Sequence, residues 1–434
     1  MKRREFLTRV GAGILASMGH GASAAPAQHA PHRRPNIILI MADDLGYECL
    51  GCYGSVSYKT PALDQLAKTG LRFDHAYSQP LCTPSRVKLM TGRCNFRNYV
   101  AFGVLDPGET TFAHVLHRAG YATCVAGKWQ LYGRKPGWVG AGTYPDRAGF
   151  DDYCLWQIEE RESRYADPLI KRKGAPLHVF KGAYGPDVFC DYITEFMERN
   201  RRRPFLVYYP MCLVHDPFVP TPDSEAWRED RNAQNVKYFA DMVAYMDKVV
   251  GRIVRKVDEL GLRDNTLILF TGDNGTSGKI VSEMAGGRTI RGGKGHTTDA
   301  GTHVPFIANW QSVVPPGSVC DDLISFDDFL PTLAQVAGAP LPRNVTIDGR
   351  SFAPQLRGEK GNPREYILCH YDPRHGEWSR TRFARDKRWK LYDDGRLFDV
   401  LADPLEQAPI YPEEDAANIQ APRTVLQQAL NSMP

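Results

Sequence analysis

The sequence predicts an α/β protein with a mixed, mostly parallel sheet sandwiched by helices, followed by a small C-terminal antiparallel-sheet subdomain. Three continuous apolar runs, at residues 36–42, 205–209 and 266–270, are typical of strands buried on both faces of a parallel sheet. Segments with helical periodicity lie between these runs, and such alternation favours parallel strand pairing. A chain of 434 residues is also long enough to bury a large core.

The first 24 residues are expected to be an export signal, and they are left out of the fold. Lys2-Arg3-Arg4-Glu5-Phe6-Leu7 is similar to a twin-arginine signal, and Ala22-Ser23-Ala24 offers a cleavage site. The apolar run between them, at 10–18, is too short to span a bilayer. A disordered basic tail is the alternative. We therefore expect a periplasmic or extracellular protein without stable membrane insertion.

Charge and cysteine content argue against a nucleic-acid-binding protein, a disulfide-stabilised protein and a zinc protein. Removal of residues 1–24 takes away four basic residues and one acidic residue, so the formal charge falls from +4 to +1. That balance gives no reason to expect a nucleic-acid partner. The ten cysteines do not suggest a disulfide framework, and Cys49 and Cys52 have no second pair at zinc-ligand spacing.

Several helices are predicted between the strands. Thr60 and Pro61 suit a helix start, and Gly70 and Gly120 suit helix ends. The longest segment, 232–260, carries an apolar stripe at helical spacing that we assign to the core. The predicted helices cover residues 60–67, 111–119, 188–199, 232–260 and 326–336.

The composition changes to glycine, proline and charged residues near 357–363, which indicates a boundary. We therefore divide the exported chain into a domain at 25–360 and a C-terminal α+β subdomain at 361–434. Short strands in the subdomain are predicted at 366–369, 381–384, 389–392 and 396–399, with a terminal helix after them.

Polar residues follow the predicted strands, where open α/β sheets place their ligands. Asp43 and Asp44 follow the strand at 36–42, and Asp273 and Asn274 follow the strand at 266–270. Lys128 follows a predicted strand at 121–126, and His215 follows the run that begins at Phe205. Turns and solvated strand ends are the structural alternatives for each of them.

The sequence Cys82-Thr83-Pro84-Ser85-Arg86 predicts the start of a short helix. Pro84 suits the first helical turn, and Gly92 is placed to end the helix. Cys82 then lies at or just before the helix N-terminus, where the unpaired N–H groups favour negative charge. Arg86, one turn later, faces the same place. A buried free cysteine at a helix start is the structural alternative.

This pentapeptide and its continuation Leu89-Met90-Thr91-Gly92-Arg93 resemble the signature of the formylglycine-dependent sulfatases, and the whole signature matches. The resemblance runs from residue 34 to about residue 352. It implies an alkaline-phosphatase-like fold and oxidation of Cys82 to formylglycine by a formylglycine-generating enzyme. It also implies that one hydroxyl of the hydrated aldehyde attacks sulfur to form a covalent sulfo-enzyme, which the second hydroxyl resolves.

The resemblance also implies roles for the residues at the strand ends. Hard oxygen donors imply Ca²⁺, with Mg²⁺ less suitable. The implied metal ligands are Asp43, Asp44, Asp273, Asn274 and the modified Cys82. The implied catalytic residues are Cys82, Arg86, Lys128, Lys294 and His215, with the lysines binding sulfate and His215 acting as general acid.

The chain departs from the family pattern at Gln130, where histidine is usual. Glutamine can hydrogen-bond the diol but cannot act as a base near neutral pH. His296 and His303 are the substitutes that we consider for the proton acceptor. Gln130 and His303 are also candidate substrate-binding residues, as are His370 and Arg374 from a loop that could close over the pocket. Aromatic residues at 138–165, Trp156 among them, are candidates for stacking on sugar rings.

We therefore predict an exported sulfatase whose substrate is a sulfated saccharide or another sulfate ester. The first alternative keeps the site and changes the bond, as a formylglycine-dependent phosphonate or phosphodiester hydrolase. The second is a catalytically inert sulfated-glycan-binding protein with unmodified Cys82, which the glutamine at position 130 favours.

Overall fold

The computed structural model describes residues 34–133, 140–414 and 416–433, so the predicted export signal and Trp138 lie outside the described residues. A mixed, mostly parallel sheet of ten strands runs through the protein in the order β12-β2-β11-β8-β1-β7-β3-β4-β5-β6. Its strands are β1 (Asn36–Ala42), β2 (Leu71–Tyr77), β3 (Ala122–Lys128), β4 (Asp152–Trp156), β5 (Leu169–Arg172), β6 (His178–Val179), β7 (Phe205–Pro210), β8 (Thr266–Gly272), β11 (His303–Asn309) and β12 (Ser318–Ser325).

Strand β1 lies at the centre and pairs in parallel with both β7 and β8. All seven of its residues are buried, as its continuous apolar run predicted. Strand β3 pairs in parallel with β7 and β4, whereas β11 pairs antiparallel with β2 and β8. The predicted fold class is therefore confirmed, and the three strands β8, β1 and β7 end at one edge of the sheet.

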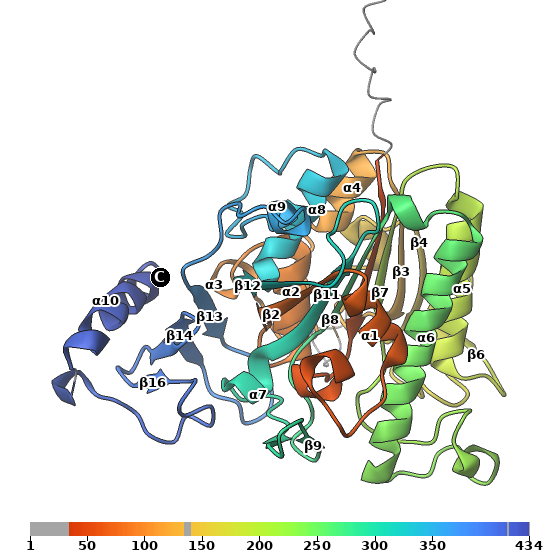
Figure 1. Ribbon diagram of the computed structural model, residues 1–434. Coiled ribbons are helices and arrows are strands. Elements are labelled where there is room, and N and C mark those ends of the chain that lie inside the picture. The colour runs from red at the N-terminus through yellow and green to blue at the C-terminus, as the bar shows by residue number, and fades with distance from the viewer. Residues whose placement is uncertain (1–33, 134–139, 415, 434) are drawn as a thin grey trace, which may run out of the picture. The chain divides into compact units, whose positions relative to one another are not determined.

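Helices cover both faces of the sheet (Figure 1). Alternate residues of β1 point to opposite cores: Ile38 and Ile40 pack with α1, α5 and α6, and Ile37 and Leu39 pack with α2, α4 and α8. The helices are α1 (Pro61–Lys68), α2 (Cys82–Thr91), α3 (Asn95–Asn98), α4 (Phe112–Arg118), α5 (Gly185–Asn200), α6 (Phe239–Glu259), α7 (Asp299–Thr302), α8 (Phe329–Ala337), α9 (Ala353–Leu356) and α10 (Ala417–Asn431).

The long helix α6 begins at Phe239, seven residues after its predicted start at 232. A 3₁₀ turn, Val236–Tyr238, precedes it, and the Asn235 side chain accepts a hydrogen bond from the Lys237 amide at 3.0 Å. Asn235 therefore caps a separate turn instead of continuing the helix. Strands β11 and β12 were not predicted, and both are set by pairing with β2.

The C-terminal part forms a separate antiparallel sheet in the order β13-β14-β15-β16, as predicted. Its strands are β13 (Ile367–Tyr371), β14 (Thr381–Arg385), β15 (Trp389–Tyr392) and β16 (Leu397–Asp399), and a two-stranded ribbon pairs β9 (Val281–Glu283) with β10 (Thr289–Arg291). Helix α10 packs Leu426 and Leu430 against this sheet. The boundary at residue 360 stays a prediction.

All ten cysteines are free thiols in this structure. Within the described ranges, no helix combines the length and the apolar character that crossing a membrane requires.

Candidate active site

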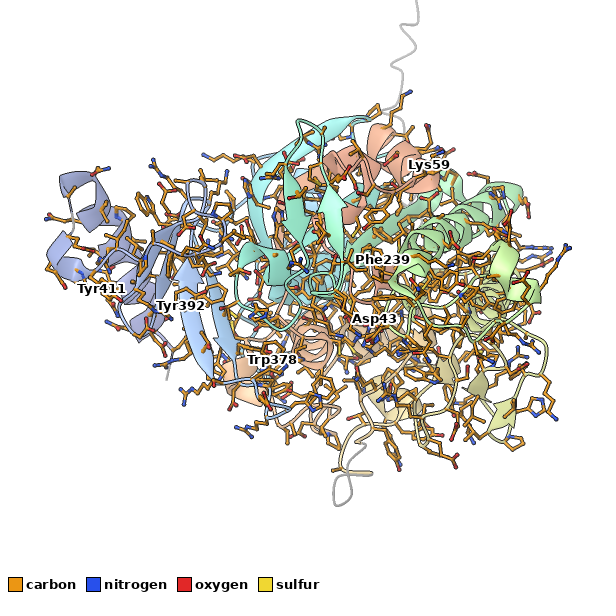
Figure 2. All side chains as sticks on the ribbon, turned by 90° about the horizontal axis from the view of Figure 1, so that it is seen from below. Asp43, Lys59, Phe239, Trp378, Tyr392 and Tyr411 are labelled. Carbon is orange, nitrogen blue, oxygen red and sulfur yellow. The ribbon has the colours of Figure 1, made fainter. Side chains whose placement is uncertain are left out.

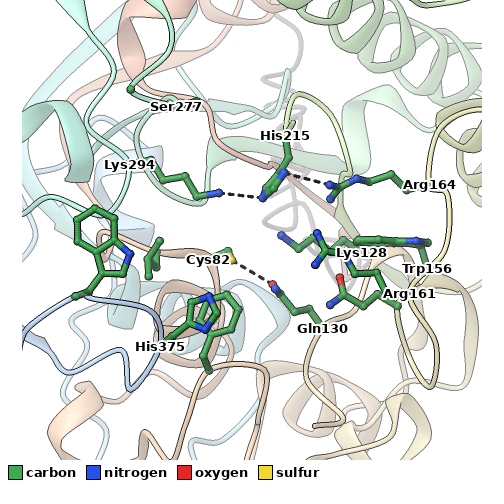
Figure 3. Close-up of a pocket in the computed structure, with 15 residues that line it drawn as sticks. Cys82, Lys128, Gln130, Trp156, Arg161, Arg164, His215, Ser277, Lys294 and His375 are labelled. Atoms are coloured by element: carbon green, nitrogen blue, oxygen red, sulfur yellow. Dashed lines mark hydrogen bonds between the residues drawn. The ribbon is translucent and has the colours of Figure 1, made fainter. Parts of the chain in front are cut away.

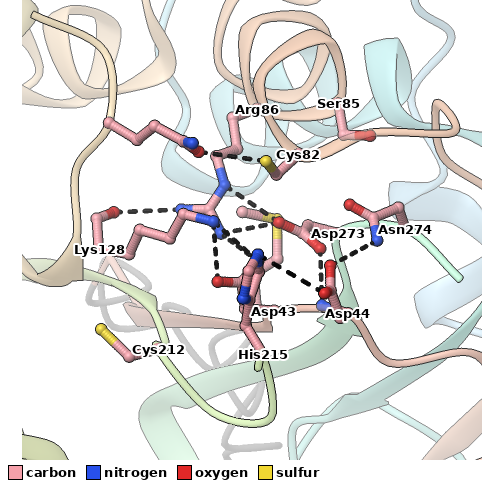
Figure 4. A network of polar contacts seen from close by, with 12 residues as sticks. Asp43, Asp44, Cys82, Ser85, Arg86, Lys128, Cys212, His215, Asp273 and Asn274 are labelled. Atoms are coloured by element: carbon pink, nitrogen blue, oxygen red, sulfur yellow. Dashed lines mark hydrogen bonds and ion pairs between the residues drawn. The ribbon is translucent and has the colours of Figure 1, made fainter. Parts of the chain in front are cut away.

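The predicted polar residues meet where the central strands end. Asp43 follows β1, Asp273 follows β8, and Lys128 is the last residue of β3. The segment after β7 is tied to the segment after β1 by two hydrogen bonds: the Asp43 amide to the Leu213 carbonyl and the Val214 amide to the Asp43 carbonyl, both at 2.8 Å. The sheet order β8-β1-β7-β3 thus gathers residues that are far apart in the sequence (Figure 4).

Cys82 is the first residue of α2, and Gly92 ends this helix in the left-handed conformation with φ of 67°. Every residue of α2 is buried, so the helix is a fixed part of the core and not a surface cap. Burial raises the pKa of the Cys82 thiol, and Lys128 opposes that shift. The Cys82 Sγ donates to Gln130 Oε1 at 3.1 Å. The unmodified residue is therefore a neutral thiol held by an amide.

Each carboxylate of the site has its own cation. The ammonium and guanidinium groups lie within 3 Å of a carboxylate oxygen, so these charges are compensated although they are buried. The pairs are Lys128 with Asp43 at 2.8 Å, Arg86 with Asp273 at 2.8 Å, and Lys294 with Asp44 at 2.7 Å.

The two buried carboxylates Asp43 and Asp273 respond differently to this field. Burial alone would raise the pKa of Asp43, but the charges of Lys128, Arg86 and Lys294 outweigh it and hold the pKa far below its usual value. Burial raises the pKa of Asp273 to about 7, and the neighbouring charge of Asp43 adds to the rise. A divalent cation at this place would favour the ionised form of Asp273.

The donor set fits a hard cation. The Asn274 Nδ2 group donates to Asp44 Oδ1 and to the Gly275 carbonyl, both at 2.9 Å, which leaves its Oδ1 buried without a hydrogen-bond partner. Buried acceptors are rarely left unpaired. Ligand atoms of Asp43, Cys82 and Asp273 also lie within 4.8 Å of one another. Carboxylate and amide oxygens in such a cluster suit Ca²⁺ or Mg²⁺.

The hydrogen bonds of His215 define its tautomer. Its Nδ1 lies 2.7 Å from the Asp216 carbonyl and 2.9 Å from an Asp216 carboxylate oxygen, and both of these are acceptors. Nδ1 therefore carries the hydrogen. Its Nε2 lies 2.9 Å from Lys294 Nζ, from which it accepts. Because burial lowers the pKa of His215, the imidazole is neutral. It is therefore a neutral acceptor in a hydrogen-bonded pair with the Lys294 ammonium.

A cavity of about 350 Å³ opens above Cys82, and four of the candidate residues line it: Lys128, Lys294, His215 and Gln130 (Figure 3). Arg86 does not line it, because its guanidinium is buried behind Cys82 and also donates to the Lys128 carbonyl at 3.1 Å. The lining residues are Leu81, Cys82, Phe102, Lys128, Gln130, Trp156, Gln157, Arg161, Arg164, His215, Ser277, Gly278, Lys294, His375 and Trp378.

His303 and His296 are not among the residues that line this cavity. His303 Nε2 donates to the Asp74 carbonyl at 2.9 Å, and the ring is stacked on Tyr47 and Tyr77. Burial lowers the pKa of His303 to about 4. The structure thus holds the half-buried His303 ring between Tyr47 and Tyr77 beside β2, and not in the cavity where a proton acceptor is needed.

The loop after β13, which we expected to close over the pocket, lines the cavity with residues other than His370 and Arg374. His370 lies on β13 with its ring near Phe96, and Arg374 donates to the Val100 carbonyl at 2.7 Å, so neither lines the cavity. His375 and Trp378 from the same loop do line it. In the view of Figure 2, Trp378 lies between Asp43 and the C-terminal sheet that carries Tyr392.

Sequence reasoning missed the arginines of the cavity. Arg161 and Arg164 belong to the loop after β4, which carries no motif, and their only signal is their place in the aromatic-rich stretch. Trp156, one of the aromatic residues considered as candidates for stacking on sugars, is 1% exposed, and the Arg164 guanidinium lies 4.5 Å from its ring centre. Its indole therefore supports Arg164 and has little free face for a sugar.

Comparisons with known proteins agree with this geometry. The sequence model described as Sulfatase matches residues 35–339, and the one described as N-sulphoglucosamine sulphohydrolase, C-terminal, matches residues 294–433. Arylsulfatase A of Homo sapiens is 35% identical over 88% of this chain and 80% of its own. Steryl-sulfatase of Mus musculus is 30% identical over 95% of this chain and 84% of its own. The crystal structure of Ps i-CgsB in complex with k-i-k-neocarrahexaose superposes with a TM-score of 0.75, at 27% identity over 92% of each chain.

Proposed function

Because the chain belongs to the sulfatase family and is a sulfuric ester hydrolase, we propose that it cleaves a sulfate ester of a saccharide at Cys82, converted to formylglycine. One observation carries this proposal. The first residue of a fully buried helix lines a cavity together with two lysines and a histidine, directly above a cluster of carboxylates. When Cys82 is oxidised, the hydrated aldehyde supplies one hydroxyl that attacks sulfur and a second that releases sulfate.

Asp43, Asp44, Asp273 and Asn274 would hold a divalent cation, for which we propose Ca²⁺ rather than Mg²⁺. The unpaired Asn274 Oδ1 and the all-oxygen donor set support a hard divalent cation, and a cluster of several carboxylates beside an amide is a ligand set typical of Ca²⁺. When bound, the cation supplies Lewis acidity and orients the groups around it. Arg86 keeps Asp273 in place through contacts at 2.8 and 3.2 Å, so we assign it a positioning role.

Lys128 and Lys294 would bind the sulfate oxygens. Both ammonium groups line the cavity beside Cys82, and each is fixed by a carboxylate at 2.7–2.8 Å. Fixed cations stabilise the charge that develops on the sulfuryl oxygens without reorganising during the reaction. His215 and Lys294 share a hydrogen bond at 2.9 Å, so the proton for the leaving oxygen would come from this pair.

Gln130 occupies a position at which it can orient the nucleophile. Its Oε1 accepts from Cys82 Sγ, and its backbone holds the rare φ of 59°. The amide can accept a hydrogen bond from a hydroxyl at the same place, but it cannot take up a proton near neutral pH. We therefore propose an orienting role for Gln130 and no role as a base.

Two observations support a saccharide as the leaving group. The solved structure of Ps i-CgsB, which has the same fold and 27% identity, holds k-i-k-neocarrahexaose. In this chain, Trp378 and Phe102 line the cavity, and the Phe102 ring stacks on His375 at 4.0 Å between ring centres. Aromatic faces of this kind pack well on sugar rings. We further propose export by the predicted N-terminal signal and modification by a formylglycine-generating enzyme.

The test is hydrolysis by the full chain made in cells that contain a cysteine-modifying enzyme. We expect release of sulfate from aryl and saccharide sulfates at rates well above those for matched phosphate diesters and phosphonates. Faster cleavage of the phosphorus esters would favour the phosphonate or phosphodiester hydrolase. Glycan binding without any release, after confirmed conversion of Cys82, would favour the glycan-binding protein.

A further inference from the structure

Two arginines of the cavity differ from the other cations of the site. Lys128, Arg86 and Lys294 each have a carboxylate partner, whereas Arg161 and Arg164 have none within 4.0 Å among the residues that the structure describes. Arg164 is only 5% exposed. A buried guanidinium without a counter-charge is costly, and such groups are normally paired.

The contacts of Arg164 fix the position of its guanidinium but include no carboxylate that would neutralise its positive charge. Its Nη2 donates to the Asp216 carbonyl and lies 3.2 Å from His215 Nδ1, and its guanidinium stacks over Trp156. The Asp216 carboxylate is directed elsewhere, to His215 at 2.9 Å and to Lys279 at 3.4 Å. The remaining N–H groups of Arg164 are therefore available to a ligand in the cavity.

Arg161 lies on the same wall and is exposed. Partial burial of its guanidinium, and then the positive charge of Arg164, lower the pKa of Arg161, as expected for two like charges on the wall of one cavity. Among the residues that the structure describes, none that lines this cavity is an Asp or a Glu. An anion between the two arginines would relieve their repulsion and accept several charged hydrogen bonds.

This wall is separate from the place of the reacting sulfate. Figure 3 shows Lys294, His215 and Arg164 in a row, with Arg164 on the far side of His215 from Lys294. Figure 3 also shows His375 on the other side of Cys82 from Arg161 and Arg164, and the Phe102 ring stacks on His375 at 4.0 Å between ring centres. A sugar that places its scissile sulfate at Cys82 would thus have an aromatic wall on one side and the two arginines on the other.

We propose that Arg161 and Arg164 bind a second anionic group of the substrate, either a carboxylate or a second sulfate, on the sugar whose sulfate ester is cleaved. This inference rests on the proposed saccharide substrate. It makes the two arginines determinants of specificity, since a hydrogen-bonded charge pair changes affinity by roughly tenfold or more.

The test measures binding, so that it does not depend on turnover. Isothermal titration of the full chain would compare two matched pairs of sugars. One pair is N-acetylglucosamine 6-sulfate and glucosamine 2-N,6-O-disulfate, and the other is glucose 2-sulfate and glucuronic acid 2-sulfate. We expect the doubly anionic sugar to bind at least tenfold more tightly in one pair or both, and the pair that shows it identifies sulfate or carboxylate as the second anion.

The variant Arg161→Gln should weaken the binding of the doubly anionic sugar about tenfold. It should change the affinity for the singly charged sugar by less than threefold. The control Arg202→Gln makes the same change at an exposed arginine outside the cavity, before the start of β7. Equal weakening of both sugars by Arg161→Gln, or no preference for a second anion in either pair, would overturn the inference. Release of sulfate from 4-nitrophenyl sulfate, measured separately, tests the proposed function independently of these outcomes.

Discussion

Glu48 connects the stability of the protein to pH through the loops that carry the metal-site residues. It lies in a 3₁₀ turn, Tyr47–Cys49, a few residues after Asp44, and it is fully buried. Its Oε1 accepts from Thr276 Oγ1 at 2.5 Å, and Thr276 Oγ1 in turn accepts from the Gly46 amide at 2.9 Å. Its Oε2 is buried without a hydrogen-bond partner. Burial raises the pKa of Glu48 from 4.5 to about 6.

The size of the effect follows from linkage between protonation and folding. Between pH 4.5 and 6 the native protein keeps the proton on Glu48, while the unfolded chain releases it. The free energy of unfolding therefore falls as pH rises through this window and stays lower above it. A rise of 1.5 in pKa corresponds to about 2 kcal/mol. Glu48→Gln keeps an acceptor for Thr276 and cannot ionise, so it should remove this loss.

Guanidinium unfolding at pH 4.5 and pH 7, followed by circular dichroism, measures the prediction. We compare the free energy of unfolding of Glu48→Gln with that of the wild-type chain. The difference between the two should shift in favour of Glu48→Gln by about 2 kcal/mol from pH 4.5 to pH 7. Glu283→Gln makes the same substitution at an exposed position and serves as the control. If the free energy of unfolding of Glu48→Gln differs from that of the wild-type chain by the same amount at both pH values, the reasoning is refuted.

Three further predictions concern the metal, the proton donor and the backbone. Chelation of divalent cations should abolish sulfate release and Ca²⁺ should restore it better than Mg²⁺, whereas full activity of metal-free protein would contradict the assigned ligands. His215→Ala should slow esters with poor leaving groups by roughly 10²–10⁴-fold and activated aryl sulfates much less, and equal slowing would count against a role in proton donation. Gly127→Ala should cost roughly 3 kcal/mol or more in thermal unfolding, because Gly127 has a φ of 119° and a Cβ there would lie 2.0 Å from the Pro210 carbonyl oxygen. Gly174→Ala, with a φ of 71° and no atom within 4 Å of the added Cβ, should cost far less, and similar losses would show that steric contact with β7 is unimportant.

Sequence reasoning located the centre of the site because its signals are local. Buried apolar strands followed at once by polar residues placed Asp43 and Asp273, and the pentapeptide placed Cys82 at the start of α2. Parallel pairing of β1 with β8 then brings the strand ends together without further information. The same local logic predicted the small C-terminal sheet.

The walls of the cavity depend on tertiary contacts that local sequence does not contain. His303 follows the motif, but the pairing of His303 with Tyr77 across β11 and β2 stacks its ring on Tyr77 instead of directing it into the cavity. Arg164 and Trp378 enter the cavity from loops without periodicity, so neither hydrophobic pattern nor turn chemistry could reveal them.

The most direct test of the proposed function is the mass of the tryptic peptide from Phe73 to Arg86, taken from protein made in a host with a cysteine-modifying enzyme. The proposed function predicts an aldehyde in place of the Cys82 thiol, in the same preparation that releases sulfate. An intact thiol, when a known sulfatase is converted in the same cells, would contradict it and favour a protein that binds sulfated glycans without cleaving them.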